Sequence, residues 1–155
     1  SSQQSNEMIA NKIELFDNVI PASNSMMAHN LYDLGVLLSR NDFIDLSKSM
    51  VSKMKKLILR NGEYLCNWAL LALKQSLPKV EIVIYGPNAH NYNIEMLHHL
   101  KSNYYLLGTE KESSLSLFLD RRPPFGKTYI YVCIDNTCSL PVESTSDALE
   151  VLKNY

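Results

Sequence analysis

Residues 80–87 read Val-Glu-Ile-Val-Ile-Tyr-Gly-Pro, a short apolar run that ends in two turn-forming residues. Such a run is typical of a buried β-strand, because it is too short for an ordinary helix and rich in β-branched side chains. The sequence that follows alternates between strand-like and helix-like runs, which predicts a small three-layer α/β unit with a mainly parallel sheet. The further predicted elements are strands at 104–107 and 128–134 and helices at 93–102, 113–119 and 144–154.

The sequence before Pro78 has a helical character instead. Its apolar residues recur at spacings of three and four, so we predict one core-facing stripe for each long helix. The chain therefore divides into helical hairpins at 1–78 and an α/β unit at 79–155, a mixed α+β and α/β class. The predicted helices are 7–16, 23–40, 43–60 and 63–76, with stripes of Met27, Leu31, Leu34 and Leu38 in the second and Phe43, Leu46, Met50, Met54 and Leu57 in the third.

The ends of the helices carry their own signals. Ser23 or Asn24 is expected to cap the second helix, because short polar side chains accept hydrogen bonds from free amides there. Gly62 suits the left-handed position after the third helix. Ser144 or Thr145 is expected to cap the last helix. In the helix at 93–102 the residues expected to face inward are Ile94, Leu97 and Leu100.

The composition excludes several classes of function. The chain has 155 residues, is 46% hydrophobic and carries a net charge of -1, so it can form a core but cannot attract nucleic acid or an anionic membrane. No apolar run approaches the roughly 20 residues of a membrane-spanning helix, and residues 1–6 do not resemble a secretion signal. Three cysteines are too few for a disulfide scaffold, so a cytoplasmic location is expected. We find no cofactor motif and no four-ligand zinc spacing.

Cys133 and Cys138 form the sharpest local feature. If Asp135 and Asn136 make a two-residue hairpin turn, the cysteines face each other in a non-hydrogen-bonded pair, where Cα atoms about 4.5 Å apart are within disulfide reach. We rank two structural thiols ahead of a disulfide, and both ahead of a metal or redox site. A redox site would need a lowered thiol pKa, and the sequence shows neither a helix amino terminus nor a basic residue beside the pair.

Two further segments are candidate sites. Residues 86–88, Gly-Pro-Asn, lie between a strand and a helix, where α/β sheets often bind anions. We favour a plain turn, because the segment has no glycine-rich fingerprint and its proline lacks an amide. Polar residues also gather at the start of the second helix, and we favour helix caps over the lining of a cavity. These residues are Asp17, Ser23, Asn24, Ser25 and His29.

The ordered motifs resemble a known family. Residues 16–25, Phe-Asp-Asn-Val-Ile-Pro-Ala-Ser-Asn-Ser, followed by Asn30-Leu31, look like the D-G-x-x-P-S-G-N-S…N-L segment of YyaL-like proteins. Residues 122–142 resemble their closing R-P-P…G-K…A-Y-V-C…C…P-V. The resemblance covers nearly the whole chain. It departs from the pattern at Ala22 and Ser23, where the family has Ser and Gly.

YyaL-like proteins, which include a mammalian spermatogenesis-associated relative, carry a thioredoxin-like domain and a ring of six helical hairpins related to sugar epimerases. The resemblance implies that the helical half supplies the last hairpins of this α/α toroid. Asp17, Asn24 and Ser25 would then be candidate catalytic residues facing a sugar-sized cavity. No cofactor is implied.

Three hypotheses for the function follow. The chain contributes to a carbohydrate-binding, epimerase-like or isomerase-like toroid, or it is a structural module that caps the toroid or docks the thioredoxin-like domain, or Cys133 and Cys138 form a redox element. Two hairpins cannot close a ring of six, so the chain alone is not expected to be a complete enzyme. Its expected partners are the remainder of a parent chain or a second copy, and neither nucleic acid nor a membrane.

Overall fold

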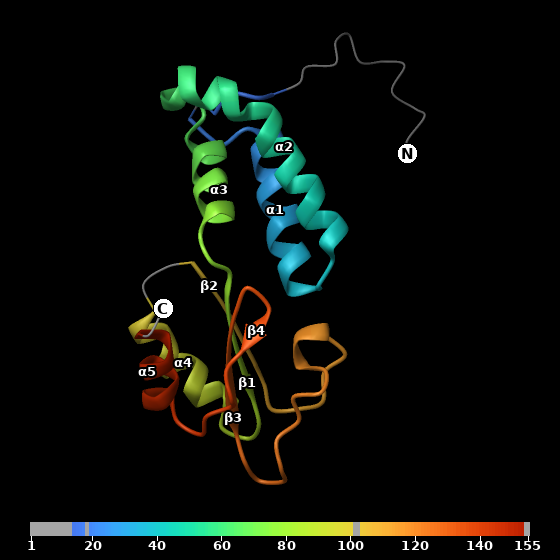
Figure 1. Ribbon diagram of the computed structural model, residues 1–155, viewed down its shortest axis with the longest axis vertical. Helices are drawn as coiled ribbons and strands as arrows, with labels where there is room; N and C mark the ends of the chain where they lie inside the picture. Colours follow the sequence, from blue (N-terminus) through green and yellow to red (C-terminus); the bar gives the residue numbers. More distant parts are fainter. Residues whose placement is uncertain (1–13, 18, 101–102, 154–155) are drawn as a thin grey trace.

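The computed structural model describes residues 14–17, 19–100 and 103–153. Within these ranges the chain is mixed α/β, with five α-helices and one four-stranded sheet. In Figure 1 the first three helices lie together at one end of the molecule and the sheet lies at the other. No helix in the described ranges is long and apolar enough to cross a membrane. The elements are α1 (Ser23–Leu37), α2 (Asn41–Arg60), α3 (Cys66–Ser76), β1 (Val80–Tyr85), α4 (Ala89–His99), β2 (Tyr104–Thr109), β3 (Tyr129–Ile134), β4 (Thr137–Cys138) and α5 (Thr145–Lys153), with 3₁₀ turns at Gly62–Tyr64 and Ser116–Phe118.

The sheet is mixed, with the strand order β2-β1-β3-β4. β2 runs parallel to β1, as a β-α-β unit requires, and pairs Tyr104 with Val80. β3 runs antiparallel to β1 and pairs Tyr129 with Tyr85, so the expected mainly parallel sheet is wrong. The reason is the connection at 110–128, which returns the chain to the carboxyl end of β1. A parallel β3 would need a crossover to the opposite end of the sheet.

Helices cover only one face of the sheet (Figure 1). On the other face Tyr85 packs against the 3₁₀ turn Ser116–Phe118, and the Tyr85 and Phe118 rings meet edge to face with 5.9 Å between their centroids. This turn replaces the helix expected at 113–119, and with it the expected third, helical layer. So short a helix is marginal by itself, and the turn already packs Leu117 and Phe118 against the sheet. The core beneath α4 and α5 consists of Ile82, Ile84, Ala89, Met96, Ile130, Val132 and Ala148.

The face that α1 turns inward is not the one that its apolar stripe predicts. Met27 and Leu34 are 55% and 45% exposed, while Ala28, Tyr32 and Val36 face the core. At Gly35 the backbone lies so close to α2 that an added Cβ would be 2.6 Å from Ile44 Cγ1. Small residues let the two helices approach closely, and this packing decides the orientation of α1. Its buried residues are Ser25, Ala28, Tyr32, Gly35 and Val36.

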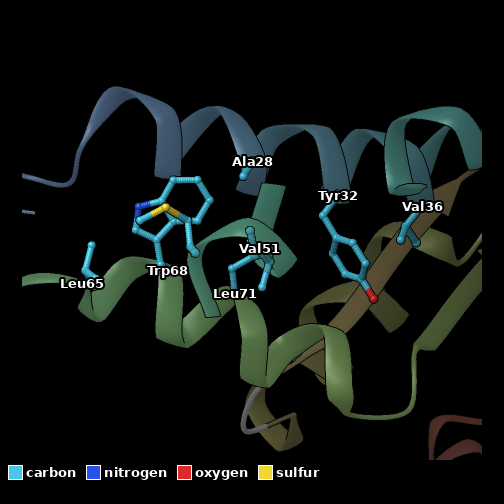
Figure 2. Packing of buried hydrophobic residues seen from close by; sticks show 8 residues of the cluster. Ala28, Tyr32, Val36, Val51, Leu65, Trp68 and Leu71 are labelled. Atoms are coloured by element: carbon cyan, nitrogen blue, oxygen red, sulfur yellow. The ribbon is translucent and has the colours of Figure 1, made fainter. Parts of the chain in front are cut away.

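A core centred on Trp68 joins the first three helices. Trp68 is 1% exposed, and its Nε1 donates to Leu15 O at 2.9 Å, which holds the segment before α1 in place. Figure 2 shows the side chains of Trp68 and Leu71 between α1 and α3. On α2, Met54 faces this core as predicted, whereas Leu46 is exposed. The other buried members are Ala28, Tyr32, Val36, Val51 and Leu65.

α4 turns a different side to the sheet from the one predicted. It begins at Ala89, before the expected start at 93, and buries Ala89 and Met96. Ile94 and Leu97, which we expected to face inward, are exposed. The apolar residues of this short helix lie on adjacent sides, so their spacing alone does not identify the buried one.

The helix ends are predicted with mixed success. Ser144 caps α5, because its Oγ accepts a hydrogen bond from Asp147 N at 3.1 Å. Gly62 lies in a 3₁₀ turn and has no positive φ. After α1, by contrast, Ser39 has a left-handed conformation, with φ of 53°. The helix expected at 7–16 lies mostly outside the described residues, and its described end is not helical.

The helical bundle and the sheet meet at Asp33 of α1. Its Oδ1 accepts hydrogen bonds from Tyr105 OH of β2 at 2.6 Å and from Lys74 Nζ of α3 at 2.5 Å. Burial raises the pKa of Tyr105 well above its usual value, and the Asp33 carboxylate beside it raises this pKa further. Through these hydrogen bonds, Asp33 connects α1 to both α3 and β2.

The Ser47→Ala variant is expected to lower the free energy of unfolding by about 1–2 kcal/mol, because it removes the two hydrogen bonds of a buried hydroxyl group. Ser47 Oγ is fully buried, donates to Ala28 O at 2.7 Å and accepts from Gln75 Nε2 at 2.9 Å. Urea unfolding followed by Trp68 fluorescence measures the change. The matched control is Ser49→Ala, on the exposed side of α2, where alanine only improves helix propensity. Equal effects at both positions would contradict the role assigned to Ser47.

Candidate functional site

Asp17 is the centre of a hydrogen-bonded cluster at the start of two helices. Its Oδ1 accepts a hydrogen bond from Ala22 N, just before α1, at 2.8 Å. Its Oδ2 accepts one from Asn67 N, in the first turn of α3, at 2.9 Å. A carboxylate in this position satisfies free amides and interacts favourably with the positive end of the helix dipole. Asp17 therefore caps both helices, and the cap predicted for α1 from Ser23 or Asn24 is wrong.

The other polar side chains of the cluster contact one another. The buried Ser25 Oγ lies 3.1 Å from Asp17 Oδ1 and accepts a hydrogen bond from Asn67 Nδ2 at 2.8 Å. His29 Nε2 lies 2.9 Å from Asn67 O. Asn24 instead donates its Nδ2 to a backbone carbonyl of the incoming segment at 2.8 Å. Of the three candidate residues, the structure thus joins Asp17 and Ser25 in one network and leaves Asn24 outside it.

This geometry is suited to fixing helices. Each carboxylate oxygen of Asp17 already accepts a backbone N–H, so a sugar hydroxyl or a transferred proton would compete with a helix cap. Sequence reasoning missed Asn67, which lies 50 residues from Asp17 along the chain. Its sole signal is a polar residue near the start of a helix, a position that many proteins use for capping.

The β3–β4 hairpin pairs Cys133 with Cys138, and the predicted register is confirmed. Asp135 and Asn136 have φ values of 46° and 68°, as a tight two-residue hairpin turn requires. The next residue pair is hydrogen-bonded through Ser139 N, so the cysteines occupy a non-hydrogen-bonded pair. Their sulfurs are joined in a disulfide, in place of the two thiols that we ranked first, and their Cα atoms are 3.9 Å apart.

Arg121 faces this disulfide. Its Nη2 lies 3.3 Å from Cys138 Sγ and 3.4 Å from Cys133 Sγ. Tyr131 OH donates to the Arg121 carbonyl at 3.0 Å, and the guanidinium carbon lies 5.6 Å from the centre of the Tyr131 ring. The Arg121 Nη1 is buried without a hydrogen-bond partner among the described residues. Sequence reasoning missed Arg121 because it lies in a loop 12 residues before Cys133, where no local pattern connects the two.

The turn at 86–88 uses its amides within the fold. Gly86 N donates to Thr109 O at 3.0 Å, Ala89 N donates to Gly86 O at 3.0 Å, and Asn88 N donates to Thr128 Oγ1 at 2.9 Å. An anion would find these donors occupied, which agrees with a plain turn. Within the part of the chain that the structure describes, no group of three or more His, Cys, Asp or Glu side chains is placed to hold a metal ion.

The family resemblance rests on the order of motifs along the chain. The structure gives several of these motif residues a role in folding, because Asp17 caps two helices, and Cys133 and Cys138 close a hairpin. These roles explain the residues without a ligand. Comparison of the chain with protein-family models, with curated proteins and with solved structures finds no match in any of the three.

Proposed function

We propose that this chain is a structural and interaction module whose helical part packs against further α-helices. The observation that carries the proposal is the outward orientation of apolar residues at helical spacing on α1 and around α3. Spacings of seven and four at α1, and of three and four at α3, place them along the same side of each helix. These exposed residues are Met27, Leu34 and Leu38 at α1 and Leu70, Leu73 and Leu77 at α3.

The side of a helix that faces solvent usually carries polar residues, whereas these sides of α1 and α3 carry leucine and methionine. Fully burying one leucine or methionine side chain contributes about 1.5–3 kcal/mol, so partly exposed stripes on two helices leave several kcal/mol to be gained by docking. Extended apolar patches of this kind are typical of interaction surfaces. Helical hairpins are the partner that fits best, because ridges of leucine side chains pack into the grooves of a neighbouring helix. In the resemblance given above, these partners are the remaining hairpins of an α/α toroid, which the α/β unit would cap.

The carbohydrate-binding alternative has weaker support from the site. Asp17 and Ser25 are engaged with helix amides and with each other, and Asn24 points to a different carbonyl. A catalytic group needs open access to substrate and neighbours that converge on the reacting atoms. The polar atoms of the Asp17 cluster form hydrogen bonds to the helices and to one another, so we favour the interaction module.

Self-association of the chain tests the proposal. Sedimentation velocity over a range of concentrations is expected to show a reversible dimer for the unmodified chain, because no helix among the described residues covers the stripes on α1 and α3. The Leu34→Lys/Leu73→Lys variant is expected to weaken this association by roughly tenfold or more, since two charges enter the contact. The matched control is Leu97→Lys/Leu140→Lys, two leucines that are more exposed than Leu34 and Leu73 but lie on the α/β unit.

Three results would count against the module. They are a chain that stays monomeric at all concentrations, equal weakening by both double variants, and circular dichroism showing that the Leu34→Lys/Leu73→Lys variant is unfolded. Hydrogen exchange provides a second test that identifies the partner. In the longest product of the reading frame that contains this chain, amides of α1 and α3 are expected to exchange more slowly than in the chain alone, whereas amides of α4 are expected to be unchanged.

A further inference from the structure

The two sulfurs of the disulfide differ in access. Cys138 lies on β4, the short edge strand of the sheet, and is exposed. Cys133 lies on β3, inside the sheet, and is 1% exposed. Thiol–disulfide exchange requires a thiolate to reach one sulfur while the other leaves. The fold therefore offers Cys138 to an attacking thiolate and keeps Cys133 as the leaving group.

Arg121 provides the charge that such an exchange needs. Its guanidinium carries a positive charge, and its Nη2 is within 3.4 Å of both sulfurs. A disulfide sulfur is a weak acceptor, whereas a thiolate in the same place accepts a strong, charge-assisted hydrogen bond. The contact with Arg121 is therefore stronger after the disulfide opens than before. A nearby arginine also lowers the pKa of a thiol, which makes it a better leaving group.

The acidic groups around the site have partners of their own. Glu81 of β1 lies opposite Cys133 and is buried, and its carboxylate pairs with Lys79 Nζ at 2.8 Å. Asp135 of the hairpin turn accepts a hydrogen bond from Lys79 N at 2.9 Å. The negative charge of Glu81 still repels a thiolate at Cys133, but the ion pair with Lys79 weakens this repulsion. Among the described residues, no ion pair involves Arg121, so its charge acts on the sulfurs.

We propose that Cys133, Cys138 and Arg121 form a thiol–disulfide exchange site for a small monothiol such as glutathione. This inference is independent of the interaction module. The glutathione thiolate attacks Cys138 Sγ, a mixed disulfide forms there, and the Cys133 sulfur leaves with the electron pair as a thiolate beside Arg121. A second glutathione thiolate attacks the glutathione sulfur of the mixed disulfide and releases Cys138 as a thiolate. Two electrons pass from two glutathione molecules to the protein, oxidised glutathione is the product, and each released thiolate can take a proton from water.

Reaction with reduced glutathione tests the site. The free, exposed Cys66 is first replaced in a Cys66→Ser background, so that only the pair reacts. Acid quenching, alkylation and peptide mapping are expected to find the mixed disulfide on Cys138. Arg121→Gln is expected to slow the reduction at neutral pH by about tenfold, and Arg121→Lys to keep part of the rate, because a positive charge remains. Arg122→Gln, at an exposed neighbour that pairs with Glu112 and makes no hydrogen bond to the sulfurs among the described residues, is the matched control and is expected to leave the rate unchanged.

The same variants give a readout that a merely structural role would not change. In the reduced protein, the pH dependence of alkylation is expected to show a higher thiol pKa in Arg121→Gln than in Arg122→Gln. Equal rates and equal thiol pKa values in two folded variants would overturn the proposal. So would a glutathione adduct on Cys133, or a disulfide that millimolar glutathione leaves intact. The mapping of the adduct needs no substitution at Arg121, so it decides the order of attack even if Arg121→Gln does not fold.

Discussion

Replacing Gly86 with alanine is expected to lower the free energy of unfolding by about 3–5 kcal/mol, a large part of the 5–15 kcal/mol that stabilises a typical domain. Gly86 follows β1 with φ of 135°, a conformation that a residue with a Cβ rarely adopts. An added Cβ would lie 2.3 Å from Lys127 O and 2.6 Å from Thr128 Cα. Both are backbone atoms, so no side-chain rotation can relieve the clash.

Gly62→Ala is the matched control for this prediction. Gly62 has no atom within 4 Å of an added Cβ and has no positive φ, so the substitution is expected to change stability by less than about 1 kcal/mol. Urea unfolding of both variants measures the difference. A Gly86→Ala protein as stable as Gly62→Ala would contradict the close approach of the β1–α4 turn to residues 127–128. An insoluble Gly86→Ala protein beside a folded Gly62→Ala protein would support it.

Features that depend on neighbouring residues could be predicted from the sequence. The strand at 80–85 has a short, β-branched composition and ends at turn residues, and its predicted bounds are correct. The pairing of Cys133 with Cys138 follows from a turn of two residues that tolerate positive φ, and it is also correct. In both cases the deciding interactions lie within a few residues.

Features that depend on distant packing could not be predicted in this way. β3 is a strand as expected, but its direction depends on the end of the sheet at which the loop at 110–128 finishes. No local sequence pattern indicates that end. The stripe of α1 contains leucines, yet the side of the helix that carries Gly35 faces α2, because close approach of two backbones outweighs the size of the apolar side chains.

The candidate sites show the same limit. Asp17 and Ser25 attract notice from the sequence because they lie beside a helix start, and the choice of helix caps over a cavity agrees with their hydrogen bonds. Asn67 and Arg121 complete the two clusters from other parts of the chain. Neither residue belongs to a motif, so their roles emerge only when the fold brings them to Asp17 and to the disulfide.

Asp17→Ala is expected to lower the free energy of unfolding by about 2–4 kcal/mol, because one substitution removes several hydrogen bonds to a charged acceptor and the favourable charge at two helix starts. The estimate lies below a simple sum, since bonds that share one residue are not additive. Asp17→Asn is expected to cost less. Its side-chain oxygen can still serve Ala22 N, but its amide nitrogen cannot accept from Asn67 N. The control is Asp45→Ala, an exposed carboxylate on α2.

The order of these variants separates a structural from a catalytic Asp17. Helix capping predicts that Asp17→Ala is least stable, Asp17→Asn intermediate, and Asp45→Ala close to the unmodified chain in urea unfolding. A carboxylate that serves catalysis often lowers the stability of the fold, so its removal is neutral or stabilising. An Asp17→Ala variant as stable as the unmodified chain, or more stable, would therefore favour the carbohydrate-binding alternative. The location of the damage adds a second criterion. Loss of a shared cap is expected to speed hydrogen exchange at the first turns of both α1 and α3, although these lie far apart in the sequence, while α4 and α5 remain protected.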